Sequence, residues 1–328
     1  MKSPKLVLCA SVLGLLLMWA MPSCSRNQTM AFYAEDFWWE FLDRDGSFRE
    51  KLVRIAQERG YLLSIVRSEG KAVAAMSDEG SIDSYRLVVV SPFASAGSSA
   101  TAQDNSNTLI LVFGYRGKFT QNQPIPPNLA YLYFDRRETY QRAGKIIGSL
   151  LSSPQKVWGK NASSLIGGKA GILVLPLTEG EEAEVSAFRT GFLERADKSR
   201  LIERRISDTH DRSKVKKLLE EMKTEGVFIY LLKTFELTGY CLEFLQKEGG
   251  LAIVEDWKGP EPYRAAILVS VEEDYIRSLE QAFSNISRIT GSWKERTIQG
   301  YTLLNWNKEQ EINLQEVNSD DYKVTGDD

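Results

Sequence analysis

From residue 29 onward the sequence alternates short runs of β-branched and aromatic residues with longer segments of helical period. Parallel strands need a crossover connection, usually a helix, so this alternation is typical of βαβ units. Two groups of strands are expected, the first at residues 29–34, 61–66, 85–91, 108–114 and 129–134, the second at 170–177, 201–207, 227–232 and 251–257. We therefore predict an α/β fold with two Rossmann-like lobes, each built on its own parallel sheet.

The segments between the strands support this prediction. In residues 48–60, the apolar side chains Phe48, Leu52 and Ile55 fall on one helical face, and Gly60 is a natural helix end. Another amphipathic helix is expected to begin at Asp211. Polar, Pro-rich or Gly-rich loops are expected at residues 94–107, 117–128 and 152–169.

The 328 residues exceed what one hydrophobic core usually serves, which also favours two lobes. A last strand at 265–270 and a helix at 275–286 look like the chain returning to the first lobe. The domain assignment is as follows: signal peptide 1–23, tether 24–28, N-terminal lobe 29–135 plus 271–302, C-terminal lobe 136–270 plus 303–315, and a disordered acidic tail 316–328.

The N-terminus has the pattern of a secretory signal. Lys2 and Lys5 precede an uncharged run from residue 6 to residue 21, and a small residue, Ser23, precedes Cys24. The segment around Cys24 resembles a bacterial lipobox, which implies cleavage before this cysteine and its acylation. Two or more acyl chains anchor a protein stably, so the resemblance implies a lipid-anchored protein of the bacterial cell envelope, facing the periplasm or the exterior. A retained membrane anchor and an ordinary secreted protein are the alternatives.

Charge and histidine content exclude several function classes. The chain has 41 Lys and Arg against 44 Asp and Glu, and loss of Lys2 and Lys5 would make it more acidic, so nucleic acid is not an expected partner. Zinc sites and catalytic triads usually draw on histidine, and His210 is the only one. The sequence contains no recognisable P-loop or nucleophile elbow. We expect no enzyme activity, no metal and no cofactor, and we expect no intramolecular disulfide after signal removal because only Cys24 and Cys241 remain.

Two α/β lobes behind a lipid anchor resemble a type I periplasmic binding protein, in which crossing strands join the lobes. Short motifs in the same order are similar to those of the basic membrane protein family, the purine-nucleoside-binding lipoproteins of ABC importers; they lie at residues 45–48, 126–153, 183–192, 237–244, 251–257 and 267–275. The resemblance implies capture of a purine nucleoside, or of a sugar as the next choice, by hinge closure between the lobes. It also implies an ABC permease as partner, and we expect a monomer.

Three positions depart from the family pattern. Arg49 stands where the family has asparagine, Glu273 where it has lysine, and Cys241 where it has glycine. A guanidinium donates but does not accept hydrogen bonds, and a glutamate reverses the charge of its site. These departures leave open a second function, in which a degenerate binding fold acts as a ligand sensor or a structural surface lipoprotein.

The best candidate for binding ligand hydroxyls is Asp256, because it follows a predicted strand and open α/β sheets bind ligands beyond the carboxyl ends of their strands. The alternative is a carboxylate that caps the next segment. Asp45 and Phe48 gain weight from the family motif but equally fit a helix start. Arg136 and Arg137 lie at the predicted first crossing, as a hinge pair facing Glu138 or Glu273 or as solvated residues.

Aromatic side chains are the candidates for covering the flat faces of a ligand. Four aromatic residues fall within residues 37–41, and Trp38 or Trp39 is expected either to wall the ligand or to pack in the core. The complete set of predicted ligand-binding residues is Phe37, Trp38, Asp45, Phe48, Arg49, Phe188, Asp256, Trp257, Ser270 and Glu273, of which Phe188 and Ser270 rest on the family motifs.

Overall fold

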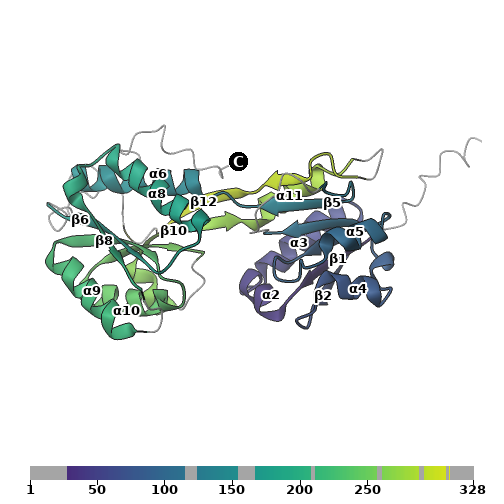
Figure 1. The fold of residues 1–328 in the computed structure, drawn as a ribbon, viewed down its shortest axis with the longest axis horizontal. Helices are drawn as coiled ribbons and strands as arrows, with labels where there is room; N and C mark the ends of the chain where they lie inside the picture. Colours follow the sequence, from purple (N-terminus) through teal and green to yellow (C-terminus); the bar gives the residue numbers. More distant parts are fainter. Residues whose placement is uncertain are drawn as a thin grey trace, which may run out of the picture. The chain divides into compact units, whose positions relative to one another are not determined.

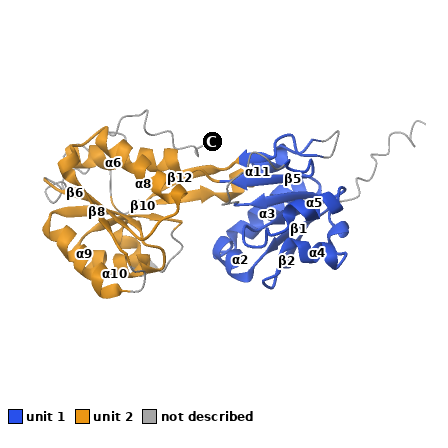
Figure 2. Cartoon of the chain, viewed as in Figure 1, with its two compact units in different colours: residues 1–133, 280–298 blue, residues 134–279, 299–328 orange. Residues whose placement is uncertain are grey.

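The computed structural model describes residues 28–114, 124–153, 167–207, 211–256, 261–287, 292–307 and 310. The chain forms two compact units, which Figure 2 colours separately. Unit 1 comprises residues 1–133 and 280–298, and unit 2 comprises residues 134–279 and 299–328. The predicted Cys24 lipidation site, Trp257 and His210 lie outside the described residues.

Unit 1 is built on a six-stranded sheet in the order β11-β5-β4-β3-β1-β2 (Figure 1). Its strands are β1 (Gln28–Ala34), β2 (Tyr61–Arg67), β3 (Leu87–Val90), β4 (Leu109–Phe113), β5 (Leu129–Tyr133) and β11 (Thr297–Gln299). The first five pair in parallel. The helices between them are α2 (Asp36–Leu42), α3 (Ser47–Glu58), α4 (Val73–Asp78) and α5 (Ser98–Asp104). All residues of β3 and β4 are buried, as expected for a parallel sheet covered on both faces.

Unit 2 repeats this topology in the order β12-β10-β9-β8-β6-β7. Its strands are β6 (Lys169–Val174), β7 (Leu201–Arg205), β8 (Val227–Lys233), β9 (Leu251–Glu255), β10 (Ile267–Asp274) and β12 (Tyr301–Trp306), and only the β10–β12 pair is antiparallel. Its helices are α6 (Arg137–Ser152), α8 (Glu179–Leu193), α9 (Arg212–Thr224) and α10 (Thr238–Glu248), while α11 (Tyr275–Ser284) runs from unit 2 into unit 1.

Local sequence signals explain where several helices of unit 2 begin. Helix α8 starts with a capping box, in which the hydroxyl of Thr178 accepts from the backbone N–H of Glu181 and the Glu181 carboxylate accepts from the backbone N–H of Thr178. Helix α9 starts at Asp211 as predicted, because its carboxylate accepts from the N–H groups of Ser213 and Lys214.

The predicted fold class is confirmed: both units are α/β with six-stranded, mostly parallel sheets. Two details differ from the prediction. The expected loop at 94–107 contains helix α5, whose small and polar sequence has little apolar period. Strand β10 continues to Asp274 because it pairs with β12 as far as that residue, so residues 271–279 belong to unit 2 and not to the first lobe. In the described part of the chain, no helix has both the length and the apolar composition needed to cross a membrane.

Candidate functional site

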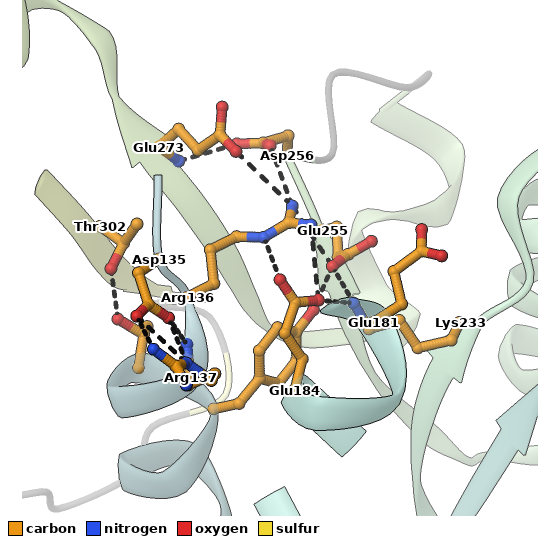
Figure 3. Close-up of polar contacts among 12 residues, drawn as sticks. Asp135, Arg136, Arg137, Glu181, Glu184, Lys233, Glu255, Asp256, Glu273 and Thr302 are labelled. Atoms are coloured by element: carbon orange, nitrogen blue, oxygen red, sulfur yellow. Dashed lines mark hydrogen bonds and ion pairs between the residues drawn. The ribbon is translucent and has the colours of Figure 1, made fainter. Parts of the chain in front are cut away.

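The carboxyl ends of the strands in unit 2 gather a buried cluster of charged side chains, drawn in Figure 3. In sheets of this topology the strand order reverses beside the first strand of the unit, here between β6 and β8, and ligands bind at the carboxyl edge near that point. Strands β8, β9 and β10 each bring a charged residue to this edge. We name these residues together with their helical partners the Arg136 cluster: Arg136, Tyr140, Glu184, Lys233, Glu255, Asp256 and Glu273.

Arg136 lies at the centre of the cluster, at the start of α6, with its guanidinium among four carboxylates (Figure 3). Its Nε donates to Glu184 Oε1 at 3.0 Å, and its Nη1 lies 3.3 Å from Glu255 Oε1. The same Nη1 is 3.9 Å from Asp256 Oδ2 and 3.8 Å from Glu273 Oε1. Burial by itself disfavours the charged guanidinium, but the surrounding carboxylates hold the pKa of Arg136 well above its usual value.

Lys233 supplies the second positive charge and is completely buried at the end of β8. Its amine forms ion pairs with Glu184 and Glu255 and lies over the ring of Tyr140, 4.4 Å from the centroid. The Tyr140 hydroxyl donates to Glu255. Burial would raise the pKa of Glu255, yet Arg136 and Lys233 lower it overall, so Glu255 stays ionised.

Asp256 directly follows β9, as predicted, and occupies the left-handed backbone region with φ of 36°. Its Oδ1 accepts from the backbone N–H of Glu273 at 2.9 Å, and its own N–H donates to Val271. The side chain is 12% exposed and that of Glu273 is 5% exposed. Burial and then the charge of Glu273 raise the pKa of Asp256 to about 7.

Unit 1 has its own set of polar and aromatic groups at the carboxyl edge of its sheet. Glu35 follows β1 and Ser91 follows β3, on the two sides of the strand-order reversal. The Ser91 hydroxyl donates to Glu35 Oε2 at 2.5 Å and accepts from the N–H of Ala94 at 3.1 Å. The hydroxyl of Ser68, which follows β2, is buried and has no hydrogen-bond partner within the described residues.

Two aromatic rings beside these groups are exposed to solvent. Phe37 is 57% exposed and Phe93 is 56% exposed, and their ring centroids are 5.0 Å apart. Trp38 is buried behind them, stacked on Phe41 at 5.3 Å and edge-on to Phe93 at 5.7 Å. An exposed aromatic pair next to a carboxylate suits a ligand with a flat or apolar face and hydroxyl groups at its rim.

The structure divides the predicted ligand residues into several environments. Asp256 and Glu273 meet in the Arg136 cluster, and Phe37 lies in the exposed aromatic pair, whereas Phe48 and Phe188 are buried in the cores of units 1 and 2. Ser270 is buried on β10. Their direct contact with a ligand stays a prediction.

The motif at residues 45–48 forms the start of α3, which matches the alternative interpretation. Asp45 Oδ1 accepts from the N–H of Ser47 at 3.0 Å, and the backbone N–H of Arg49 donates to Asp43 Oδ1 at 2.8 Å. The side chain of Arg49 is exposed. Phe48 packs edge-on against Phe32 and Trp39 in the core.

Several residues of the Arg136 cluster, and Glu35 and Ser91 of unit 1, were not predicted from the sequence. Lys233 and Glu255 carried a usable signal, because each is a charged residue that ends a continuous apolar strand. Glu184 carried none, since it lies within an amphipathic helix and reaches Arg136 only through the crossing of α6 and α8. Of the two predicted arginines, Arg136 is buried near Glu273, and Arg137 is exposed and pairs with Asp135.

Cys241, which replaces a glycine of the family pattern, is a free thiol buried in α10. Burial raises its pKa to about 12, so the thiol is protonated at neutral pH and has little nucleophilic character. Among the described residues, no group of histidine, cysteine and acidic side chains is arranged to hold a metal ion.

Comparison with solved structures identifies the fold. A solute-binding protein of an ABC transporter system from Conexibacter woesei superposes with a TM-score of 0.61 at 15% identity, covering 85% of this chain and 88% of that chain. A periplasmic ribose ABC transporter protein from the same organism gives 0.54 at 10% identity, covering 87% and 93%. A transcriptional activator of the comK gene from Bacillus halodurans gives 0.55 at 13% identity, covering 91% and 99%. No protein-family model matches the sequence, and no curated protein matches it.

Proposed function

We propose that the chain is the solute-binding lipoprotein of an ABC importer and captures a small polar ligand rich in hydroxyl groups. The observation that carries the proposal is the Arg136 cluster, in which the adjacent parallel strands β8, β9 and β10 deliver Lys233, Glu255 and Glu273 to the carboxyl edge of one sheet. Open α/β sheets bind their ligands at this edge. Several of the solved structures with this fold are proteins of ABC transporter systems.

The side chains support a ligand that donates hydrogen bonds through hydroxyl groups. An ionised carboxylate accepts hydrogen bonds and donates none. Each unit has such a group at the carboxyl edge of its sheet, Asp256 in unit 2 and Glu35 in unit 1. Phe37 and Phe93 add an exposed aromatic surface. A nucleoside or a sugar has both features, and a neighbour of the same fold is a ribose transporter protein. Lipid anchoring at Cys24, closure of the units by a hinge and delivery to a permease complete the proposal.

The first test is native mass spectrometry of the full-length chain purified without refolding, because solute-binding proteins can retain a ligand from the cell. A bound mass that matches a nucleoside or a sugar supports the proposal. A chain that is empty and whose melting temperature stays unchanged with nucleosides and sugars contradicts it, since any ligand that binds only the folded state stabilises that state.

Two variants then locate the ligand. Phe37→Ala is expected to weaken binding about tenfold, because a stacked ring contributes about 1 to 3 kcal/mol. Leu193→Ala is the matched control, since Leu193 is also an exposed apolar side chain but ends helix α8 of unit 2. Equal affinities of the two variants would argue against the aromatic pair as a ligand wall.

A second candidate function is a ligand sensor or structural surface lipoprotein without transport. Two observations favour it: Arg136 and Lys233 already pair with carboxylates of the protein itself, and one solved structure of this fold is a transcriptional activator. A bound solute together with unchanged uptake in a deletion strain would support the sensor over the importer.

A further inference from the structure

A buried carboxylate of unit 1 has little around it to balance its charge. Glu35 directly follows β1 and is 8% exposed. Its Oε2 accepts from the hydroxyl of Ser91 at 2.5 Å, and among the described residues no other group hydrogen-bonds to the carboxylate and no lysine or arginine forms an ion pair with it. Burying a carboxylate costs free energy unless cations and hydrogen bonds replace the lost water. Glu35 therefore needs a partner that the described chain does not supply.

Two basic residues near this edge of the sheet have carboxylate partners of their own. Arg67 ends β2, which lies beside β1, and its Nε is 3.3 Å from Asp36 Oδ1. Lys71 donates to Glu79 Oε1 at 3.0 Å. Both basic side chains are more than one-third exposed, so their charges are also screened by solvent. Neither of them balances the charge of Glu35.

A second buried polar group at the same edge has no partner. Ser68 directly follows β2, and its backbone N–H donates to the carbonyl of Ala34 at 2.9 Å, which places it level with Glu35. Ser68 is 1% exposed, and within the described residues its hydroxyl makes no hydrogen bond. Buried hydroxyl groups are nearly always hydrogen-bonded. A water molecule could satisfy this hydroxyl, but it could not balance the charge of Glu35.

The exposed aromatic pair borders these two groups. Phe37 and Phe93 follow Glu35 and Ser91 by two residues each, and their ring planes meet at 65° with the centroids 5.0 Å apart. Both rings are more than half exposed. The face of an aromatic ring attracts a cation that lies within about 6 Å of its centroid. The two rings therefore favour a positive charge at the same edge of the sheet.

We propose that the captured solute carries a protonated amine that binds at this edge of unit 1, where it donates to Glu35 and Ser68 while Phe37 and Phe93 cover the adjoining carbon atoms. The inference rests on the proposed solute-binding function and adds a substrate class to it, a hydroxyl-rich compound with a primary amine. An ammonium group has three N–H donors and a full positive charge, so it can satisfy both Glu35 and Ser68. A solute hydroxyl could complete the same hydrogen bonds, but it would leave the charge of Glu35 unbalanced.

The first experiment compares matched neutral and amine-bearing compounds by calorimetric titration of the full-length chain at pH 6.5. The pairs are glucose with glucosamine and sorbitol with 1-amino-1-deoxysorbitol. The amine-bearing member is expected to bind at least tenfold more tightly, and any solute that the purified chain retains is expected to react with an amine-labelling reagent. A retained or bound solute without an amine overturns this inference and leaves the solute-binding function standing. A chain that is empty and binds none of the compounds contradicts both.

Three variants locate the amine. Glu35→Gln keeps the shape of the side chain and still accepts from Ser91, but it should lower the affinity for the amine-bearing compound at least tenfold and leave that of its neutral match unchanged. Ser68→Ala removes one hydrogen bond and should lower the same affinity about fivefold. Asp36→Asn is the matched control, because Asp36 is the neighbouring carboxylate but is 69% exposed and pairs with Arg67. Equal losses in Glu35→Gln and Asp36→Asn would contradict the assignment.

A measurement without solute keeps the test decisive whatever the compounds do. In the solute-free chain Glu35→Gln removes an unbalanced buried charge, so its melting temperature should rise by about 2 to 4 °C, whereas Asp36→Asn should show no such rise. A carboxylate that serves only the fold would give the opposite sign. A lower melting temperature, or a Glu35→Gln chain that fails to fold, would show that Glu35 is balanced within the protein and would overturn the inference.

Discussion

Lys233 ends strand β8 as a buried cation between two carboxylates, and its removal should be costly. Lys233→Met keeps the length of the side chain but leaves Glu184 and Glu255 with Arg136 as their only charged partner in the described cluster. Removing one partner of a buried ion pair costs about 3 to 5 kcal/mol, so unit 2 is expected to lose about 3 kcal/mol of its free energy of unfolding. The midpoint of urea unfolding measures this loss.

The control for Lys233 is Lys247→Met on helix α10. Lys247 pairs with Glu243 at 2.7 Å, but both side chains are exposed, and such solvent-screened pairs contribute little to stability. If Lys233→Met unfolds at the same urea concentration as Lys247→Met, the buried network does not stabilise unit 2.

At the scale of single residues, the sequence predicted which residues follow the strands better than it predicted which side chains contact those residues. Asp256 was predicted because it follows a continuous apolar strand, and the structure places it directly after the carboxyl end of β9. Arg136, 3.9 Å from Asp256, was predicted only as part of a hinge pair with Arg137 that faces Glu138 or Glu273, or as a solvated residue. The convergence of Glu184 on Arg136 depends on how α6 crosses α8, which no local pattern of the sequence specifies.

Helices α6 and α8 approach each other closely through glycines. A Cβ atom on Gly191 would lie 1.9 Å from the carbonyl oxygen of Gln141, and one on Gly144 would lie 2.1 Å from the carbonyl oxygen of Phe188. These contacts are with backbone atoms, so the helices would have to separate. Gly191→Ala is expected to destabilise unit 2 by about 3 kcal/mol, at the upper end of the usual cost of overpacking. Thermal unfolding followed by circular dichroism measures the change.

Gly180→Ala provides the control on the same helix. Gly180 lies in the first turn of α8, where a Cβ atom would have only Thr178 Oγ1 at 4.0 Å as a neighbour. Alanine is a better helix former than glycine, so this variant should be as stable as the original chain or more stable. Equal melting temperatures for Gly180→Ala and Gly191→Ala would show that the helix crossing tolerates a side chain.

At the scale of elements, burial decided what could be predicted. Strands β1, β2, β4 and β5 match their predicted ranges within one or two residues. Strand β4 is a continuous buried apolar run, whereas β2 contains Ser64 and is mostly only partly buried, so its match rests on its content of β-branched and aromatic residues. The short strand β11 was missed, because only Ile298 of its three residues is buried. Helix α5 was missed because Ala and Ser side chains create no apolar period.

For the whole molecule, the two-lobed α/β architecture followed from the alternation of strands and helices, while the points at which the chain passes between units did not. Strand β10 reads as an apolar run that stops at Ser270, yet it continues through the charged residues Glu272, Glu273 and Asp274 because β12 pairs with them. The carboxyl end of β10 is set by pairing with β12, a strand distant in the sequence, and the periodicity of the sequence does not predict it.

The attachment of the whole chain to a membrane is predicted to depend on one atom, the sulfur of Cys24. Feeding cells an alkyne-tagged fatty acid should label the chain, and the mature protein should begin at Cys24, because the resemblance to a lipobox implies cleavage directly before this cysteine. Cys24→Ala should abolish the label, whereas Cys9→Ala should keep it, since Cys9 lies in the predicted signal peptide. Each added acyl chain strengthens membrane binding, and two or more make it stable. Full labelling of the Cys24→Ala variant would show that Cys24 is not the acylated residue, and an original chain that takes up no label would leave a secreted protein as the better interpretation.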